Sequence, residues 1–254
     1  MNEEGALRAH PDWIVPAWHA PPGIRALITT RAGGVSAAPY HSLNLGFSTG
    51  DDPRSVDENR SRLRALLPQE PRWLKQVHAA HVVEAESVHD RPAADASIAR
   101  SAGTVCAVLV ADCLPVLFAD RAGSVVAAAH AGWRGLAAGV IDNTVAAMHR
   151  AGVAAPDVMA YIGPGIGPAE FEVGDEVREA YVKLDQGAAA AFSPRSPGKW
   201  LADLPALARR ALARCGVRDI CGGDLCTYSD AQRFYSYRRD GETGRMAALI
   251  WRER

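Results

Sequence analysis

The fold is decided by one stretch of the chain, GTVCAVLVADCLPVLFADRAGSVVAAAHAGWRGLAAGVIDN, residues 103–143. Its first part, residues 104–111, is a continuous apolar run rich in β-branched residues. The run is too short for a typical helix and is bounded by a glycine and an aspartate, so it predicts a buried strand. Two shorter runs, 116–119 and 124–130, lie on either side of an Asp-Arg-Ala-Gly turn and predict two more strands.

The same stretch holds side chains that can do chemistry. Cys113 lies at a strand break and His130 at a strand end, where rigid elements hold side chains in accessible positions. The apolar spacing then becomes helical, which predicts a helix over 134–149. The chain enters this helix through Gly132 and Gly135, and the free N–H groups of a helix N-terminus can hold an anion. The alternative is that the two glycines only allow the helix to pack closely on the strand.

Length and composition indicate one globular domain. The 254 residues are 48% hydrophobic, and we expect an extended arm over 1–22 and a single domain over 23–254. The net charge of −1 argues against a nucleic-acid or membrane partner. The N-terminus is acidic, unlike a secretory signal, and no apolar run approaches the ~18 residues of a membrane span. Five irregularly spaced cysteines indicate reduced thiols. We therefore expect a cytoplasmic monomer or homodimer.

The rest of the chain alternates between strands and helices. Strands are expected at residues 24–30, 73–83, 158–162 and 246–251, and helices at 52–67, 175–184 and 201–215. Loops are expected at residues 91–101 and 186–200. The elements follow no regular βαβ period, so their order predicts an α/β fold built as a layered sandwich of mixed β-sheets and helices.

Single polar residues outside the central stretch are weaker candidates for a site. Arg31 and Asn44 lie on adjacent loops, where site residues often occur, but a surface ion pair and an ordinary turn residue explain them as well. His78 and His81 lie on the expected strand 73–83, and their odd spacing places them on opposite faces. One of them can be a metal ligand, and a histidine with only a packing or surface role is the alternative.

Seven short motifs between residues 20 and 252 belong together. They are Thr29-Thr30-Arg31-x-Gly33-Gly34-Val35-Ser36, Ser42-Leu43-Asn44-Leu45-Gly46, Gln76-Val77-His78, Asp95-Ala96-Ser97, Ala111-Asp112-Cys113-Leu114-Pro115, His130-Ala131-Gly132-Trp133-Arg134-Gly135 and Tyr237-Arg238-Arg239-Asp240. Their combination resembles the bacterial laccase-domain family, whose members are named variously multicopper polyphenol oxidase, purine nucleoside phosphorylase and peptidoglycan editing factor. The resemblance implies an α/β fold of stacked sheets and helices, akin to the cysteine hydrolase-like fold, with a single catalytic domain.

The resemblance also implies that His78, Cys113 and His130 bind a metal. Two histidines and one cysteine on separate elements leave a fourth position open, which is the pattern of catalytic zinc. Zinc is therefore the expected cofactor, and copper, which outcompetes zinc at such ligands, is the expected substitute. This chain has eight histidines and no His-x-His pair, whereas a multicopper oxidase needs more imidazole ligands than that.

The activity that the resemblance implies is phosphorolysis of adenosine, inosine and S-methyl-5′-thioadenosine, with adenosine deamination in the same pocket. The partners are thus purine nucleosides and phosphate. The expected catalytic residues are Cys113, Asp112, Asp95 and Arg31. The residues expected to bind substrate or phosphate are Asn44, Arg134, Gly132 and Gly135. Asp112 and Asp95 are candidates for the acidic group that transfers the proton in zinc deaminases.

Proteins of three further classes can use the same residues. In a cysteine hydrolase that edits peptidoglycan precursors, Cys113 is the nucleophile and His130 the base, and the thiolate carries no metal. A copper-dependent polyphenol oxidase is the second class, and a non-catalytic zinc protein is the third. Sensitivity to a chelator distinguishes the metal enzyme from the hydrolase.

Overall fold

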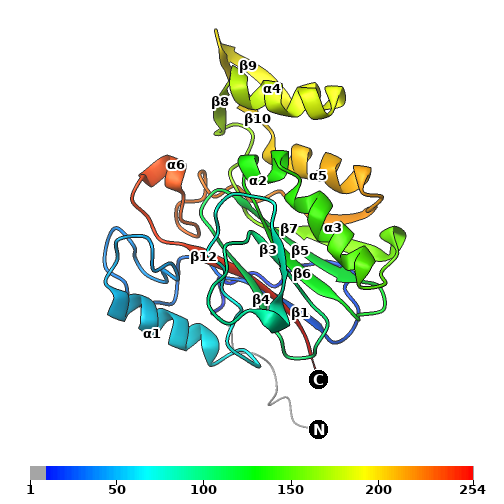
Figure 1. Ribbon diagram of the computed structural model, residues 1–254. Coiled ribbons are helices and arrows are strands. Elements are labelled where there is room, and N and C mark those ends of the chain that lie inside the picture. The colour runs from blue at the N-terminus through cyan, green and yellow to red at the C-terminus, as the bar shows by residue number, and fades with distance from the viewer. Residues whose placement is uncertain (1–9, 254) are drawn as a thin grey trace.

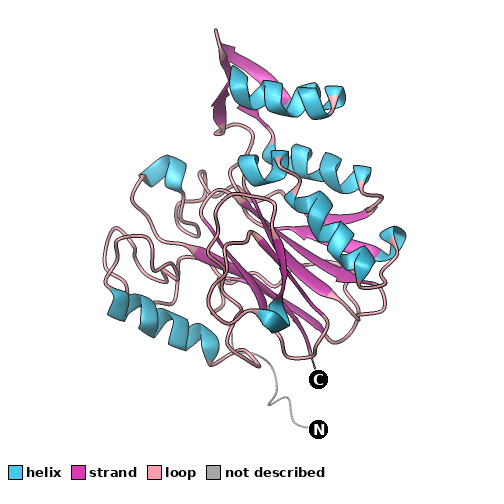
Figure 2. Ribbon diagram, viewed as in Figure 1, coloured by secondary structure: helices cyan, strands magenta, loops and turns pink. Residues whose placement is uncertain are grey.

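The computed structural model describes residues 10–253 (Figure 1). The strands are β1 (Ile24–Ile28), β2 (Val82–Glu84), β3 (Ala96–Ala99), β4 (Cys106–Val110), β5 (Leu114–Asp120), β6 (Val126–Ala131), β7 (Val158–Ile162), β8 (Glu172–Gly174), β9 (Phe192–Ser196), β10 (Lys199–Ala202), β11 (Asp219–Gly222) and β12 (Met246–Arg252). The α-helices are α1 (Pro53–Arg64), α2 (Trp133–Ala137), α3 (Val140–Arg150), α4 (Asp175–Leu184), α5 (Leu204–Arg214) and α6 (Tyr237–Asp240). Figure 2 shows most strands gathered at the centre with helices around them, and a separate small group of strands at the top.

A six-stranded mixed sheet forms the centre of the molecule, in the order β11-β7-β5-β6-β3-β2. β5 and β6 pair antiparallel, whereas β2 pairs parallel with β3 and β11 parallel with β7. Every residue of β5 and β6 is buried, because both faces of the sheet are covered. The stretch 103–143 therefore supplies the two central strands, in agreement with its apolar runs.

Two apolar cores lie on opposite faces of this sheet. On one face Leu117 packs with Val108 and Ile250 of the antiparallel sheet β1-β12-β4. On the other face Phe118 packs with Ile141 and further residues of α3 and α5, since successive side chains of a strand point to opposite faces. α1 and nearby loops cover the outer face of the sheet β1-β12-β4. These layers confirm the predicted α/β sandwich of mixed sheets and helices.

The helix predicted over 134–149 is wrong in one respect, because it is two helices. α2 ends at Ala137 and α3 begins at Val140, with Gly139 between them at φ 89°. Glycine adopts this left-handed conformation at little cost, which lets the chain turn between the helices. The apolar spacing continues through the break, so the pattern alone did not reveal it.

The strand predicted over 73–83 and the loop predicted over 91–101 are also wrong. His78 has φ 58°, which is outside the strand region, and only β2 at the end of the segment is a strand. Residues 96–99 form β3, which is buried and lies between β2 and β6. The small, polar composition indicated a loop because it gave no apolar alternation, whereas in the structure small side chains allow close packing inside the sheet.

The loop predicted over 186–200 contains regular structure instead. After a 3-10 turn over 186–191, β9 and β10 form a hairpin that joins β8 in a small antiparallel sheet. Together with α4 this sheet projects at the top of the molecule in Figure 1. The helix expected over 201–215 begins at Leu204, because Asp203 caps it by accepting the Ala206 N–H at 2.8 Å.

Residues 10–22 include contacts with the sheet β1-β12-β4. Ile14 and Ile28 exchange two backbone hydrogen bonds of 2.8 Å, and Trp13 is buried. The first part of the predicted arm, residues 1–9, lies outside the described residues, and the division of the chain into an arm and one domain stays a prediction. Among the helices of residues 10–253, none has the length and apolar character needed to cross a membrane.

Candidate metal centre and cavity

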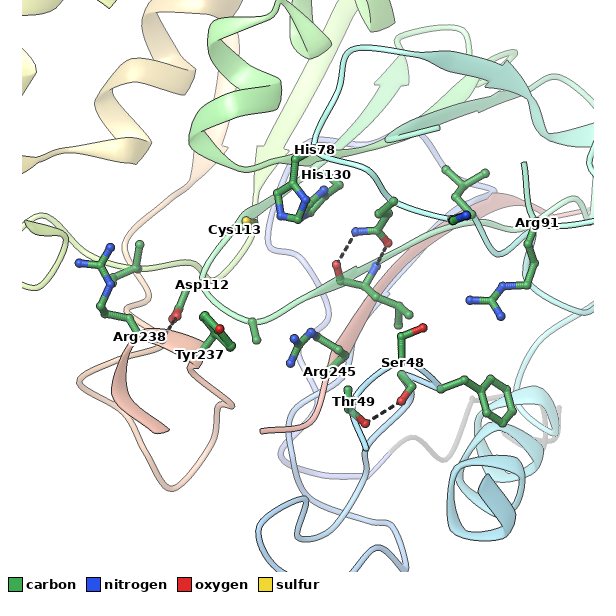
Figure 3. Close-up of a pocket in the computed structure, with 18 of the residues that line it drawn as sticks. Ser48, Thr49, His78, Arg91, Asp112, Cys113, His130, Tyr237, Arg238 and Arg245 are labelled. Atoms are coloured by element: carbon green, nitrogen blue, oxygen red, sulfur yellow. Dashed lines mark hydrogen bonds between the residues drawn. The ribbon is translucent and has the colours of Figure 1, made fainter. Parts of the chain in front are cut away.

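Three side chains from separate elements meet beside the central sheet. Cys113 lies in the turn between β4 and β5, His130 in β6, and His78 in the segment ahead of β2. Their ligand atoms all lie within 4.8 Å of one another, and the two imidazole rings meet edge to face with centroids 4.8 Å apart. His130 is buried, Cys113 half-buried and His78 exposed (Figure 3). The structure thus brings together the three ligands that the family resemblance implied.

The backbone conformation around this cluster is uncommon. His78 at φ 58° and Asp112 at φ 85° both occupy the left-handed region, which residues other than glycine rarely adopt. Gln76 anchors the first of these segments. Its side-chain amide donates to the Leu109 carbonyl and accepts the Leu109 N–H, both at 2.7 Å. The amide therefore pairs with β4 as a neighbouring strand would, and it positions the segment that carries His78.

Asp95 contacts two of the three candidate ligands. It is fully buried, and its Oδ1 lies 2.9 Å from His130 Nδ1 and accepts the His78 N–H at 2.9 Å. Its Oδ2 accepts the N–H groups of Val77 and Ala79 at 3.2 and 2.8 Å. Burial alone would raise the pKa of Asp95, but the hydrogen bonds from His130 and Ala79 outweigh it and hold the pKa below its usual value. These contacts fit a positioning role better than the proton transfer expected from the sequence.

Close approach between segments explains Gly132, which precedes α2, and Gly135, which lies within it. A Cβ on Gly132 would lie 2.5 Å from Cys113 Sγ and 3.3 Å from His78 Cδ2. A Cβ on Gly135 would lie 2.9 Å from the Ala79 carbonyl oxygen. Both glycines therefore serve packing around the cluster, which is the alternative that the sequence left open. α2 has only five residues.

The surroundings of Cys113 favour its thiolate. Burial by itself raises the pKa of the thiol, but the charge and hydrogen bonds of His130 and His78 outweigh burial and lower the pKa to about 6. Burial lowers the pKa of His130, but the contacts with Cys113 and Asp95 outweigh it and raise the pKa. A thiolate both binds metals and attacks electrophiles, so the geometry is compatible with a metal site and with a cysteine nucleophile.

A cavity of about 530 Å³ opens beside the cluster (Figure 3). Its volume falls within the ~300–1,000 Å³ typical of small-molecule sites. The cluster forms part of the wall, and loop 46–49, the end of β4 and the chain ahead of β12 form much of the rest. Aromatic and cationic side chains that line this wall are Phe47, Phe171, Tyr237, Lys75, Arg91, Arg238 and Arg245.

Asp112 lines the cavity, yet both of its carboxylate oxygens are engaged. Oδ1 accepts the Thr227 hydroxyl at 2.6 Å, and Oδ2 accepts the Arg238 N–H at 2.7 Å. These bonds tie the turn that carries Cys113 to the C-terminal part of the chain. Like those of Asp95, the contacts of Asp112 fit a positioning role.

Two arginines expected at the site lie outside the cavity wall. Arg31 donates to the carbonyl oxygens of His41 and Ala231 at 2.9 Å each, so it joins two loops. Arg134 is exposed, and its guanidinium lies over the Trp133 ring at 4.2 Å. Neither arginine lines the cavity, and Arg31 is engaged by two backbone carbonyl groups, so both lie apart from the residues that form the cavity wall.

Asn44 lies behind the wall and does not line the cavity. It is fully buried, and its Oδ1 accepts the N–H groups of Gly46 and Arg245 at 2.9 Å each. Its Nδ2 donates to the Thr49 hydroxyl at 2.8 Å. Sequence reasoning missed Arg245 and Arg91 as cavity residues. The only sequence signal for these cavity residues was their position: Arg245 is a single cation ahead of an apolar strand, and Arg91 lies in a polar segment.

Comparison with known proteins agrees with the motifs. The family model described as multi-copper polyphenol oxidoreductase laccase matches residues 25–253. The chain belongs to this family. Purine nucleoside phosphorylase YfiH of Escherichia coli is 53% identical over 241 residues, which are 94% of this chain and 98% of that protein. A purine nucleoside phosphorylase of Pseudomonas aeruginosa is 52% identical over 240 residues, with the same two coverages.

Solved structures show the same laccase-family fold. A Neisseria meningitidis protein is 50% identical and superposes with a TM-score of 0.92 over 96% of this chain and 100% of its own. YlmD of Geobacillus stearothermophilus is 34% identical, with a TM-score of 0.86 over 92% and 93% of the two chains. Because relatives named as phosphorylases match nearly the whole chain at about half identity, this laccase-family member is an enzyme.

Proposed function

We propose that this protein is a zinc-dependent purine nucleoside phosphorylase that acts on adenosine, inosine and S-methyl-5′-thioadenosine. The products are the free base and ribose 1-phosphate or methylthioribose 1-phosphate, and adenosine is deaminated in the same cavity. The observation that carries the proposal is the cluster of His78, Cys113 and His130 in the wall of a cavity lined by aromatic and cationic groups. Aromatic rings suit a purine and cations suit phosphate. The names of the relatives support the same reaction.

The donor set fits zinc. Two imidazoles and one thiolate are zinc ligands that leave a fourth position open. His130 Nδ1 lies 2.9 Å from Asp95 Oδ1, and in the neutral imidazole that donates its Nδ1–H to this carboxylate, Nε2 offers its lone pair to a metal; this is the usual outer contact of a metal-binding histidine. Gly132 leaves room for the sulfur, since a Cβ there would lie 2.5 Å from it. When bound, zinc supplies a Lewis acid and lowers the pKa of coordinated water. Copper suits the same donors and is the proposed substitute.

The side chains of the cavity hold the two reactants. In phosphorolysis a phosphate oxygen bonds to ribose C1′ while the bond from C1′ to N9 breaks, and the base leaves with a proton. Tyr237 and Phe171 line the cavity and are the rings proposed to contact the purine. The cations of the wall offset the charge of phosphate. Asp112 and Asp95 keep the turn of Cys113 and the ring of His130 in place.

The assay that tests this proposal uses adenosine with and without inorganic phosphate. With phosphate we expect adenine from adenosine and hypoxanthine from the inosine that deamination makes, with ribose 1-phosphate equal to the two bases together, identified by chromatography and mass spectrometry. Without phosphate we expect inosine and ammonia but no free base, because deamination needs only water and replaces the amino group of the purine with oxygen. Absence of ribose 1-phosphate at every phosphate concentration, with fully metal-loaded protein, contradicts the proposed phosphorolysis.

Asp95→Asn is expected to weaken metal binding without removing a ligand. The amide oxygen can replace only one of the two carboxylate oxygens as an acceptor of N–H groups, and the charge that orients His130 is lost. Such changes lower metal affinity by ~10–100-fold. Competition with a chromogenic chelator measures the affinity. Asp120→Asn is the matched control, because Asp120 is also buried and accepts three hydrogen bonds, from Ser124 N–H, Ser124 hydroxyl and Val125 N–H. An equal loss of affinity in both variants would indicate a general loss of stability instead.

A cysteine hydrolase is the second candidate, and one observation favours it. Cys113, His130 and Asp95 contact one another in series, with 2.9 Å between His130 Nδ1 and Asp95 Oδ1. A nucleophile, a base and a group that orients the base form the arrangement of cysteine and serine hydrolases. Peptidoglycan precursors are the proposed substrates of such a hydrolase, and the kinship with the cysteine hydrolase-like fold stays a prediction.

A copper-dependent polyphenol oxidase has less support. Within residues 10–253 the groups of side chains able to hold a metal are the cluster described above and a second group of His19, Asp219 and Cys221. His19 is exposed, and Asp219 already pairs with Arg121 at 2.9 Å. Neither group has more than two histidines, whereas several copper centres need more imidazole.

A further inference from the structure

The guanidinium of Arg245 lies in the cavity wall opposite the metal cluster, and two of its nitrogens have N–H groups without an acceptor among residues 10–253. Arg245 directly precedes β12, and its Nη1 donates to the carbonyl oxygens of Thr243 and Gly244 at 2.9 Å each. Within residues 10–253, Nε and Nη2 have no hydrogen-bond acceptor, and no carboxylate lies within ion-pair distance. Figure 3 shows Arg245 between Tyr237 and the loop of Ser48 and Thr49.

The surrounding chain is built to hold this side chain. Asn44 Oδ1 accepts the Arg245 N–H at 2.9 Å from 201 residues away in the sequence. A Cβ on Gly46 would lie 2.8 Å from Arg245 Cγ, so the glycine leaves the space that the stem of Arg245 occupies. The guanidinium is therefore fixed before any ligand binds, which lowers the entropic cost of binding.

The charge of the cavity is unbalanced around Arg245. Burial lowers the pKa of Arg245, although the negative charges of Cys113 and Asp112 act in the opposite direction. Among residues 10–253, Asp112 is the only carboxylate in the cavity wall, and both of its oxygens are engaged elsewhere. The wall also contains Lys75, Arg91 and Arg238. A half-buried cation that forms no direct ion pair within residues 10–253 costs free energy, which an anion bound beside it offsets.

We propose that Arg245 is the phosphate-binding residue of the cavity and holds an oxyanion through Nε and Nη2. Two parallel N–H donors from a planar guanidinium match two oxygens of phosphate. The assignment rests on the proposed phosphorylase function, and it transfers to Arg245 the role that the sequence suggested for Arg134. Asn44 becomes a positioning residue, because it acts through the backbone of Arg245.

The test compares Arg245→Gln and Arg245→Lys with the wild-type holoenzyme. For Arg245→Gln we expect the KM for phosphate to rise by about 10–100-fold, since one charge-assisted contact is lost. This rise should exceed the change in KM for the nucleoside by at least tenfold. Arg245→Lys keeps the charge but not the paired donors, so a smaller rise is expected. Arg62→Gln, which removes an exposed arginine paired with Glu58 on α1, is the control for loss of charge.

A binding measurement makes the result independent of turnover. Titration of inorganic phosphate into the metal-loaded protein, followed by calorimetry and ³¹P NMR, should show a site in the wild type that is weakened by the same factor in Arg245→Gln. Thermal unfolding checks the fold, and if Arg245→Gln unfolds, Arg245→Lys decides. If the wild type binds phosphate through Arg245 but forms no ribose 1-phosphate, the proposed function fails and the anion subsite stands.

Two outcomes overturn the assignment while the proposed function stands. One is an active enzyme in which folded Arg245→Gln keeps the wild-type KM for phosphate. The other is a rise in that KM for Arg134→Gln but not for Arg245→Gln. A wild-type protein that shows no phosphate site, or one equally strong in Arg245→Gln, overturns the assignment as well.

Discussion

Removal of the metal with a strong chelator is expected to abolish nucleoside turnover and to make Cys113 the fastest thiol to alkylate. In the metal-bound state the lone pair and charge of the thiolate are committed to the ion, so alkylation is slow. Without the ion, His130 and His78 still favour the thiolate, and the half-buried Cys113 lines the cavity. Added zinc should restore activity and protection together. Tandem mass spectrometry of the tryptic peptide 101–121, which contains both Cys106 and Cys113, assigns the modified thiol after timed iodoacetamide treatment and measures the rates.

Cys106 is the internal control for this experiment. It is fully buried in β4, and burial, the largest effect on its thiol, raises the pKa to about 12. It should stay unmodified with and without metal. The cysteine hydrolase makes the opposite prediction, in which Cys113 reacts fastest in untreated protein and activity survives the chelator. Full activity after metal removal, verified by elemental analysis, would falsify the zinc mechanism.

Replacement of either histidine of the cluster by alanine is expected to remove the metal and the activity together. A change beside a ligand costs ~10–100-fold in metal affinity, so loss of a ligand should cost on the order of a hundredfold or more. His78→Ala should leave stability nearly unchanged, because the side chain is exposed. His130→Ala should also lower the free energy of unfolding by about 1–3 kcal/mol, since it leaves the buried Asp95 without one partner. Elemental analysis and urea unfolding measure the two effects.

His81→Ala is the matched control for His78→Ala. Both residues are exposed and lie three positions apart, but His81 is not part of the metal-capable cluster. We expect His81→Ala to keep metal content and turnover. Full metal occupancy in His78→Ala or in His130→Ala would show that the residue in question is not a ligand.

Local sequence predicted the central strands because a strand buried on both faces needs a continuous apolar run. The runs at 116–119 and 124–130 became β5 and β6, one of which begins two residues earlier and one two residues later. The same reasoning failed for 96–99, where small residues carry no apolar signal although they are buried. It also failed for 186–200, because a hairpin that projects from the molecule has exposed residues on both strands.

The candidate site divides in the same way. Cys113 and His130 were singled out from their places at strand ends, whereas the choice between His78 and His81 needed the family resemblance. The structure shows why local reasoning could not choose between them. His78 has φ 58°, outside the strand region, and hydrogen bonds of Asp95 and Gln76 keep its segment in place. The alternation of side chains between the two faces of a strand therefore does not apply there.

The sequence by itself determined the layered α/β fold, the family and the set of residues proposed to bind metal. Apolar runs in the sequence mark the buried strands, and the short motifs carry the family resemblance. Only the tertiary structure decided what surrounds that set. Asp95 and Asp112 were expected to transfer protons, but contacts with distant segments engage their oxygens. Arg134 does not line the cavity and lies against Trp133 instead. Arg245 does line it, and Asn44, 201 residues earlier, holds the backbone of Arg245. Such contacts depend on how distant segments pack, and no local pattern of residue types records them.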